Sequence, residues 1–162
     1  MAISKIKLLL YILFFTVFNV HSQENIVQGP FKLKGADKAF IRYVRNSDES
    51  ISLIVQKKEK DRVVGSYELG DGVPNIETVF FTNILNASCI VTLVSWDESN
   101  VNSIHYKVYV YTYYNDGVIL LNKKVTSDKN LEGYDGYNGS GSVFELKKSN
   151  AIKGYLKGKY GK

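Results

Sequence analysis

Cysteine and histidine are scarce in this chain of 162 residues, which contains one cysteine, Cys89, and two histidines, His21 and His105. A single cysteine cannot form an internal disulfide, and a structural zinc site needs about four cysteine or histidine ligands. A serine–histidine–aspartate site in the body of the chain would depend on His105, and no Gly-x-Ser-x-Gly motif accompanies it. The sequence therefore predicts no metal, no cofactor and no nucleophilic active site.

Long hydrophobic runs are also missing, apart from one at the N-terminus. Two lysines precede the apolar run Leu8–Phe18, and Val20 and Ser22 follow where signal peptidase selects small or aliphatic side chains. A run of this length is typical of a secretory signal peptide, because a membrane-spanning helix needs about 20 residues. We therefore expect residues 1–22 to be removed and residues 23–162 to form one domain that does not span a membrane. The alternative is an uncleaved N-terminal anchor.

The expected domain has no large excess of charge of either sign. Without residues 1–22 the chain retains nineteen basic and sixteen acidic residues, and the two signs are interspersed. This balance does not favour nucleic acid as a partner. A small exported eukaryotic domain is usually rich in disulfides, so the single cysteine, together with many Lys, Asn, Tyr and Ile residues, favours a bacterial periplasmic or secreted location.

Short runs that alternate between apolar and polar residues recur along the chain, separated by turn residues. This period-two pattern is typical of half-buried strands, and turn signals every 8–12 residues are typical of a sandwich or barrel. We predict a mainly β fold, an antiparallel sheet or sandwich of about eight strands. The predicted strands are Phe31–Lys34, Ala39–Arg45, Ile51–Gln56, Val63–Leu69 with a bulge at Gly65, Thr78–Ile84, Ser88–Trp96, His105–Tyr114, Val118–Thr126 and Ser142–Leu146.

Two of these strands indicate how the sheet is covered. Ser88–Trp96 is apolar on both of its alternating faces, which predicts a buried strand with layers on either side. His105–Tyr114 places Tyr109, Tyr111 and Tyr113 on one face, and this face is either an open surface or covered. The C-terminal residues Ile152, Tyr155, Leu156 and Tyr160 fall at helical spacing after Ser149, a candidate N-cap, and predict one short helix packed on the sheet.

Aromatic residues are the strongest candidates for a binding surface, because Tyr and Trp dominate the energetically important positions of interfaces. The Gly-rich segment Ser127–Gly141 adds two tyrosines on a loop, and nearby carboxylates supply polar complementarity. The predicted partner surface consists of Tyr109, Tyr111, Tyr113, Trp96, Tyr134 and Tyr137, with Asp97, Glu98 and Asp135.

Two other functions are compatible with these residues. A secreted hydrolase could use Asp97 or Glu98 with a loop carboxylate such as Asp128 or Asp135, provided that two carboxyls share a cleft. A carbohydrate or envelope-ligand binding module could stack sugars on Trp96 and the tyrosines, provided that these rings form an exposed, flat row.

The segment Val79–Leu93, VFFTNILNASCIVTL, resembles a degenerate FG-GAP or VCBS-type repeat, in which an apolar strand leads through an Asp-x-x-x-Asp-Gly loop into another apolar strand. Asn83 stands where the first aspartate of that loop is expected, and Asn86 stands near the second, so calcium binding is not implied. More loosely, the chain is similar to small periplasmic immunity proteins. That resemblance implies an exported protein that occludes the active site of a secreted toxin or enzyme.

Overall fold

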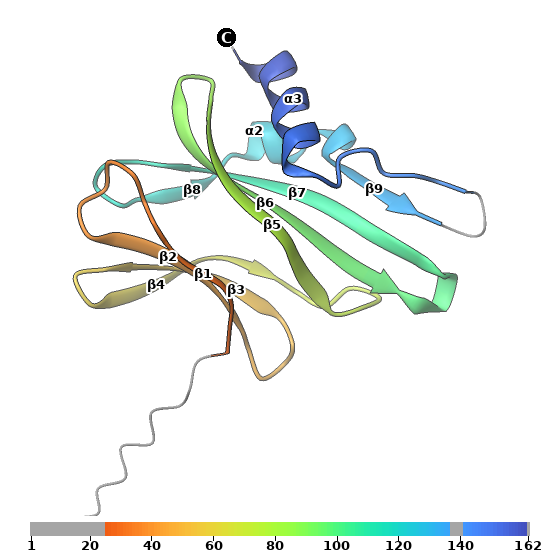
Figure 1. The fold of residues 1–162 in the computed structure, drawn as a ribbon. Helices are drawn as coiled ribbons and strands as arrows, with labels where there is room; N and C mark the ends of the chain where they lie inside the picture. The colour runs from red at the N-terminus through yellow and green to blue at the C-terminus, as the bar shows by residue number, and fades with distance from the viewer. Residues whose placement is uncertain (1–24, 137–140, 162) are drawn as a thin grey trace, which may run out of the picture.

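The computed structural model describes residues 25–136 and 141–161 (Figure 1). The predicted signal peptide, residues 1–22, and Tyr137 lie outside the described residues. Nine strands form two antiparallel sheets in the described part, and one twelve-residue helix follows near the C-terminus, so the predicted mainly β fold is confirmed. None of the helices in the described part is both long enough and apolar enough to cross a membrane.

The first sheet, sheet A, is a meander in which each strand pairs with the next along the chain. Val64 has no partner where β4 faces β3, so the bulge predicted at Gly65 occurs one residue earlier. The turn between these two strands is formed by Lys58 and Glu59, both with positive φ, as a tight two-residue hairpin requires. The strands of sheet A are β1 (Ile26–Lys32), β2 (Ala39–Arg45), β3 (Ile51–Lys57) and β4 (Lys60–Tyr67).

The second sheet, sheet B, is built around the long strands β6 and β7. One edge of β7 has two short partners: β8 pairs with Tyr111–Tyr113, and β9 pairs with Ile104–Lys107. Between them, the Val110 N–H donates to Thr126 Oγ1 (3.0 Å) and its carbonyl accepts from the Asn122 N–H (2.8 Å), so the backbone of β7 stays paired. The strands of sheet B are β5 (Pro74–Ile84), β6 (Ala87–Glu98), β7 (Ser103–Tyr113), β8 (Ile119–Leu121) and β9 (Glu132–Asp135).

Two of the predicted strands are wrong. The predicted strand Val118–Thr126 ends at Leu121, because the Asn122 side chain accepts a hydrogen bond from the Val125 N–H and caps the short helix α2 (Lys123–Thr126). The predicted strand Ser142–Leu146 is irregular in the structure, and the strand in this part of the chain is β9, which the sequence analysis treated as loop.

Three layers result from this arrangement, with sheet A on one face of sheet B and the helices on the other (Figure 1). In β6, Ile90 and Val94 face sheet A, whereas Cys89, Val91 and Leu93 face the helices, and all five are fully buried. The predicted burial of Ser88–Trp96 on both faces is therefore confirmed.

The C-terminal helix is joined to the segment that follows helix α2 by the carboxylate of Asp128, whose side chain is 6% exposed. Helix α3 (Ser149–Tyr160) buries Ile152, Leu156 and Tyr160, and its N-cap is Lys148 rather than the predicted Ser149. Asp128 accepts hydrogen bonds from Tyr155 Oη (2.6 Å), Lys159 Nζ (2.9 Å) and Tyr160 Oη (2.9 Å). Burial opposes ionisation of Asp128, but these donors outweigh it and hold the pKa of the carboxyl well below its usual value.

Candidate binding site at the loop end of sheet B

The tyrosine face of β7 is covered, and neither helix covers it. Tyr111 and Tyr113 are 2% and 7% exposed and pack against sheet A, while the helices cover the opposite face of β7. Tyr109 is partly buried and contacts Tyr67 edge-to-face, with ring centroids 4.9 Å apart. The prediction that Tyr111 and Tyr113 form a partner surface is therefore wrong.

Other predicted residues come together at the end of sheet B where β6 ends and β7 begins. The rings of Trp96 and His105 stack with centroids 5.2 Å apart, and His105 stacks on Tyr134 at 4.5 Å. This stack follows from register, because His105 lies opposite Trp96 on β6 and opposite Tyr134 on β9. We define the His105 cluster as Trp96, Glu98, His105, Lys107, Glu132 and Tyr134.

Charged groups surround the imidazole of His105. Its Nε2 lies 3.0 Å from Glu132 Oε1, and its Nδ1 lies 3.9 Å from Glu98 Oε1. Lys107 Nζ lies 2.8 Å from Glu132 Oε2. Burial opposes ionisation of Glu132, but Lys107 and His105 together lower the pKa of this carboxyl. Glu98 is buried and accepts a hydrogen bond from Ser103 Oγ (3.3 Å).

Three segments meet around this cluster, and two glycines allow the 68–73 loop to approach the end of β6. The Trp96 Nε1–H donates to the Glu68 carbonyl (2.9 Å), and Gly70 lies against the Trp96 ring. A Cβ at Gly72 would overlap the Asp97 backbone, so the 68–73 loop lies directly on the end of β6. On the other side, Asp135 pairs with Ile104. The segments 68–73, 97–103 and 132–136 therefore share one end of the sandwich.

This end of the molecule combines acidic and exposed apolar side chains. The segments 68–73, 97–107 and 132–136 contain six carboxylates and a single lysine, in a chain with 21 basic and 16 acidic residues. Leu69, Val73 and Tyr134 are 49%, 38% and 36% exposed there, and Asp97 is also exposed. The carboxylates are Glu68, Asp71, Asp97, Glu98, Glu132 and Asp135.

Asp135 differs from the other predicted residues because its carboxylate is used within the protein. It accepts hydrogen bonds from the Phe144 N–H (2.5 Å) and from Lys147 Nζ (2.6 Å), which hold residues 142–146 beside β9. Burial opposes ionisation of Asp135, but these two donors lower the pKa of its carboxyl. Asp135 therefore fixes the position of residues 142–146 at the loop end of sheet B.

The His105 cluster lacks the features that the two alternative functions require. A glycosidase needs a carboxylic acid with a raised pKa facing a second carboxyl across a cleft. Glu132 has a lowered pKa, and Glu98 is buried against Ser103. Trp96 is 6% exposed between His105 and Gly70, so its ring does not contribute to an open, flat aromatic row among the described residues. No group of three Asp, Glu, His or Cys residues able to hold a metal occurs in the described part.

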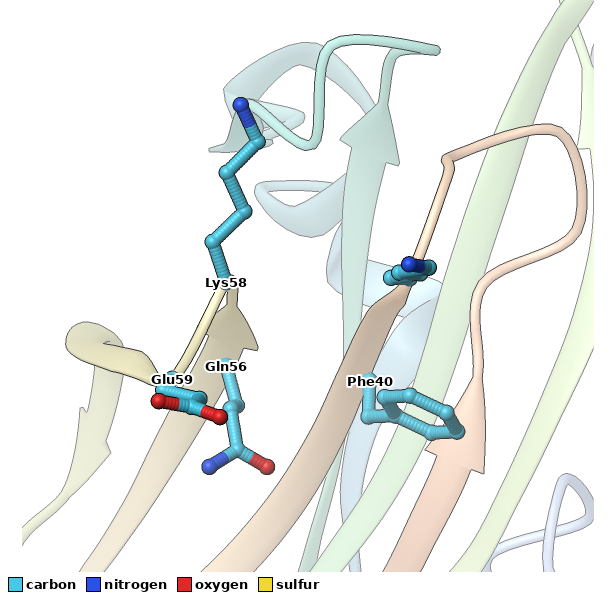
Figure 2. A pocket seen from close by; sticks show the side chains of 5 residues that line it. Phe40, Gln56, Lys58 and Glu59 are labelled. Carbon is cyan, nitrogen blue, oxygen red and sulfur yellow. The ribbon is translucent and has the colours of Figure 1, made fainter.

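A separate cavity lies on sheet A and has a volume of about 570 Å³. Figure 2 shows Phe40 and Gln56 on neighbouring strands, with Lys58 and Glu59 at the turn that follows β3. Lys38 completes the lining, so the cavity contains only one carboxylate. It therefore lacks the pair of carboxylates that a glycosidase requires.

The sequence analysis missed three members of the site: His105, Lys107 and Glu132. His105 was considered as a catalytic residue and set aside, and the two charged residues had no distinguishing pattern. The pairing of Glu132 with Lys107 depends on β9, which was not predicted.

Comparison of the chain with protein-family models, with curated proteins and with solved structures finds no match. The function must therefore be argued from the site itself.

Proposed function

We propose that this protein is an exported binding protein, most specifically an immunity or inhibitor protein that occludes the active site of a secreted toxin or enzyme. The observation that supports this proposal most directly is the loop end of sheet B. Two loops and strand β9 present exposed apolar side chains beside a stacked aromatic cluster, in segments that contain six carboxylates. Loops carried by a rigid scaffold are a common location for recognition residues.

Tyr134 is the central anchor of the proposed surface. Its ring is 36% exposed and stacks on His105, which in turn stacks on Trp96, so its orientation is set before a partner arrives. A side chain that is already ordered loses less conformational entropy on binding. Leu69 and Val73 add exposed apolar surface on the adjacent loop.

The charge of this end indicates the kind of partner. Asp71, Asp97 and Glu68 are exposed, and Lys107 is paired with Glu132. A negative surface favours encounter with a basic partner and disfavours acidic ones. The proposed mechanism is insertion of the loop end of sheet B into a cleft lined by basic residues, which excludes the substrate of the partner.

The proposal is tested by partner capture with matched variants. The protein purified from the periplasm is immobilised and exposed to secreted proteins from the same and neighbouring strains. We expect a basic protein to be retained and its activity to be inhibited by an equimolar amount of this protein. Tyr134→Ala combined with Asp97→Asn should weaken binding by more than tenfold, because anchor residues typically contribute 2 kcal/mol or more.

The matched control is Lys58→Ala, at an exposed turn of sheet A. This variant should bind and inhibit like the wild type. Equal binding by the loop-end variant and the control would contradict the proposed surface. Unchanged sensitivity of a gene-deletion strain to neighbouring strains, together with no retained protein, would contradict the immunity function.

A further inference from the structure

The helical layer on the outer face of sheet B carries the opposite charge to the loop end. Residues 146–161 contain five lysines and no aspartate or glutamate. Helix α2 adds Lys123 and Lys124, both exposed. We define the basic helical face as the five exposed lysines of this layer with no carboxylate partner in the described part of the chain: Lys123, Lys124, Lys148, Lys153 and Lys157.

Two carboxylates close to this face are already engaged within the protein. Asp128 is 6% exposed and is occupied by Tyr155, Lys159 and Tyr160. Asp135 is occupied by Lys147 and by the Phe144 N–H. Lys153 Nζ lies over the Phe80 ring, 4.9 Å from its centroid, and Glu145 is exposed in the adjoining segment. None of the five lysines forms an ion pair with a carboxylate in the described part, so their charges remain available to an external anionic group.

The remaining exposed residues of helix α3 define what kind of contact is possible. Apart from Lys159, which is paired with Asp128, they are short, and a Cβ built at Gly154 or Gly158 would meet no atom within 4 Å. The large apolar residues Ile152, Leu156 and Tyr160 are buried against sheet B. This face thus has lysines that extend beyond the helix surface and no apolar side chain that could insert into lipid. The other exposed residues of helix α3 are Asn150, Ala151 and Lys159.

We propose that the basic helical face docks this protein on the anionic surface of a lipid bilayer, through contacts between lysines and lipid phosphate groups. The choice of a bilayer rests on the export included in the proposed function, because the envelope membrane is then the extended anionic surface nearby. The docking is peripheral and electrostatic. The loop end of sheet B is formed by other segments, so bilayer docking and partner binding use separate residues.

The strength of this docking follows from the number of lysines. Each lysine near an anionic bilayer increases affinity by about fivefold, and the attraction falls off within one Debye length. One lysine alone would therefore bind the bilayer weakly, whereas five together give appreciable affinity. Salt should reduce this affinity strongly.

Vesicle sedimentation tests the inference. The protein purified from the periplasm is mixed with vesicles of phosphatidylcholine alone, or of phosphatidylcholine with phosphatidylglycerol. We expect binding only to the anionic vesicles, with a steep loss as salt is raised. Lys124→Gln combined with Lys157→Gln should reduce the affinity by roughly 25-fold, because two lysines are removed.

The matched control removes the same charge from sheet A, as Lys38→Gln combined with Lys58→Gln. It should bind anionic vesicles within about twofold of the wild type. An equal loss in this control, or no binding to anionic vesicles, would overturn the inference. Tighter binding to double-stranded DNA than to these vesicles at the same salt would also overturn it, in favour of a nucleic-acid surface.

The outcome is separable from that of the proposed function. Partner capture by the Lys124→Gln, Lys157→Gln variant should be unchanged, since its substitutions lie outside the loop end of sheet B. Failure of vesicle binding with intact partner capture would reject only the inference. Vesicle binding without any captured partner would reject only the proposed function.

Discussion

Strand β7 has two halves that share one face but have different environments. Tyr109, Tyr111 and Tyr113 pack against sheet A, whereas His105 and Lys107 lie in the part of β7 that pairs with β9, where His105 stacks on Trp96 of β6. The difference does not arise from the strand itself, because aromatic side chains and period-two alternation continue through both halves. The extent of sheet A decides which half is core and which half can become a binding surface.

The chemistry of the two halves follows from this coverage. In the covered half, burial raises the pKa of Tyr109 to about 12, so its hydroxyl stays neutral. The hydroxyls packed nearby are also neutral, and Tyr43 Oη on β2 lies 2.6 Å from Thr92 Oγ1 on β6. In the uncovered half, charges are tolerated, and His105, Lys107 and Glu132 form contacts near solvent. Burial of an ionic group is costly. The polar side chains of β7 are therefore hydroxyls where the strand is core and charged groups where it nears the surface.

Truncation of one tyrosine in each half provides the strongest test of this comparison. Tyr111→Ala should lower the free energy of unfolding by about 3–5 kcal/mol, as large buried aromatic residues do. Tyr134→Ala should lower it by only about 1 kcal/mol, the value of an aromatic contact at a partly exposed site. Urea unfolding of both variants measures the difference, and similar losses would contradict the assigned division of β7.

Asp128 tests the helical cover on the other face of β7. Asp128→Asn should lower the free energy of unfolding at neutral pH by about 2–3 kcal/mol, because hydrogen bonds to a charged group are lost. The pKa of Asp128 is lowered in the folded protein, so its contribution is present above the unfolded pKa, about 3.9, and is lost as pH falls through the lower folded value.

Urea unfolding across this acidic range measures that contribution. The wild type should lose stability below about pH 4 more steeply than Asp128→Asn. Asp97→Asn, at an exposed loop position, is the control and should leave neutral-pH stability within about 0.5 kcal/mol of the wild type. Parallel pH profiles for the wild type and Asp128→Asn would show that Asp128 does not hold the helical layer.

Gly65 tests how closely sheet A covers the tyrosines. A Cβ at this position would lie 2.5 Å from Tyr111 Oη, so Gly65→Ala should destabilise the protein by about 1–3 kcal/mol. The cost should be smaller in a Tyr111→Phe background, which removes the hydroxyl at the closest contact. A double-mutant cycle in urea measures the coupling, and additive effects would show that the two positions do not meet.

Lys107 gives the smallest expected effect and characterises the uncovered half. Lys107→Met should change the free energy of unfolding by no more than about 1 kcal/mol, since exposed ion pairs contribute little. The effect should diminish further at high salt. A loss of several kcal/mol, unaffected by salt, would indicate that this half of β7 is buried like the other.

Several elements were predictable because their signals are local. Strand Ala39–Arg45 has the predicted bounds, and the turn at Asp116-Gly117 joins β7 to β8 with Gly117 at positive φ. Strand β9 was not predictable, because four residues, EGYD, contain too little alternation to distinguish a strand from a loop. Helix α2 was not predictable because the four apolar residues before Asn122, 118–121, favour a strand that continues beyond it.

The candidate site was only partly predictable for a related reason. Trp96, Asp97 and Tyr134, which the sequence predicts as part of a partner surface, lie together at the loop end, whereas Tyr111 and Tyr113 from the same prediction are core. Aromatic residues in strands indicate burial and recognition equally well. Nothing in the sequence distinguishes the two until the position of the opposing sheet is known.

The amino-acid sequence by itself determined the mainly β architecture, most strand positions, the buried central strand β6 and the C-terminal helix, because backbone preferences and side-chain alternation act over a few residues. Only the tertiary structure decided that sheet A covers the tyrosines, that the helices cover the opposite face, and that His105 is stacked between Trp96 and Tyr134. These features depend on strand register and layer packing between residues far apart in the chain, which local sequence patterns do not encode.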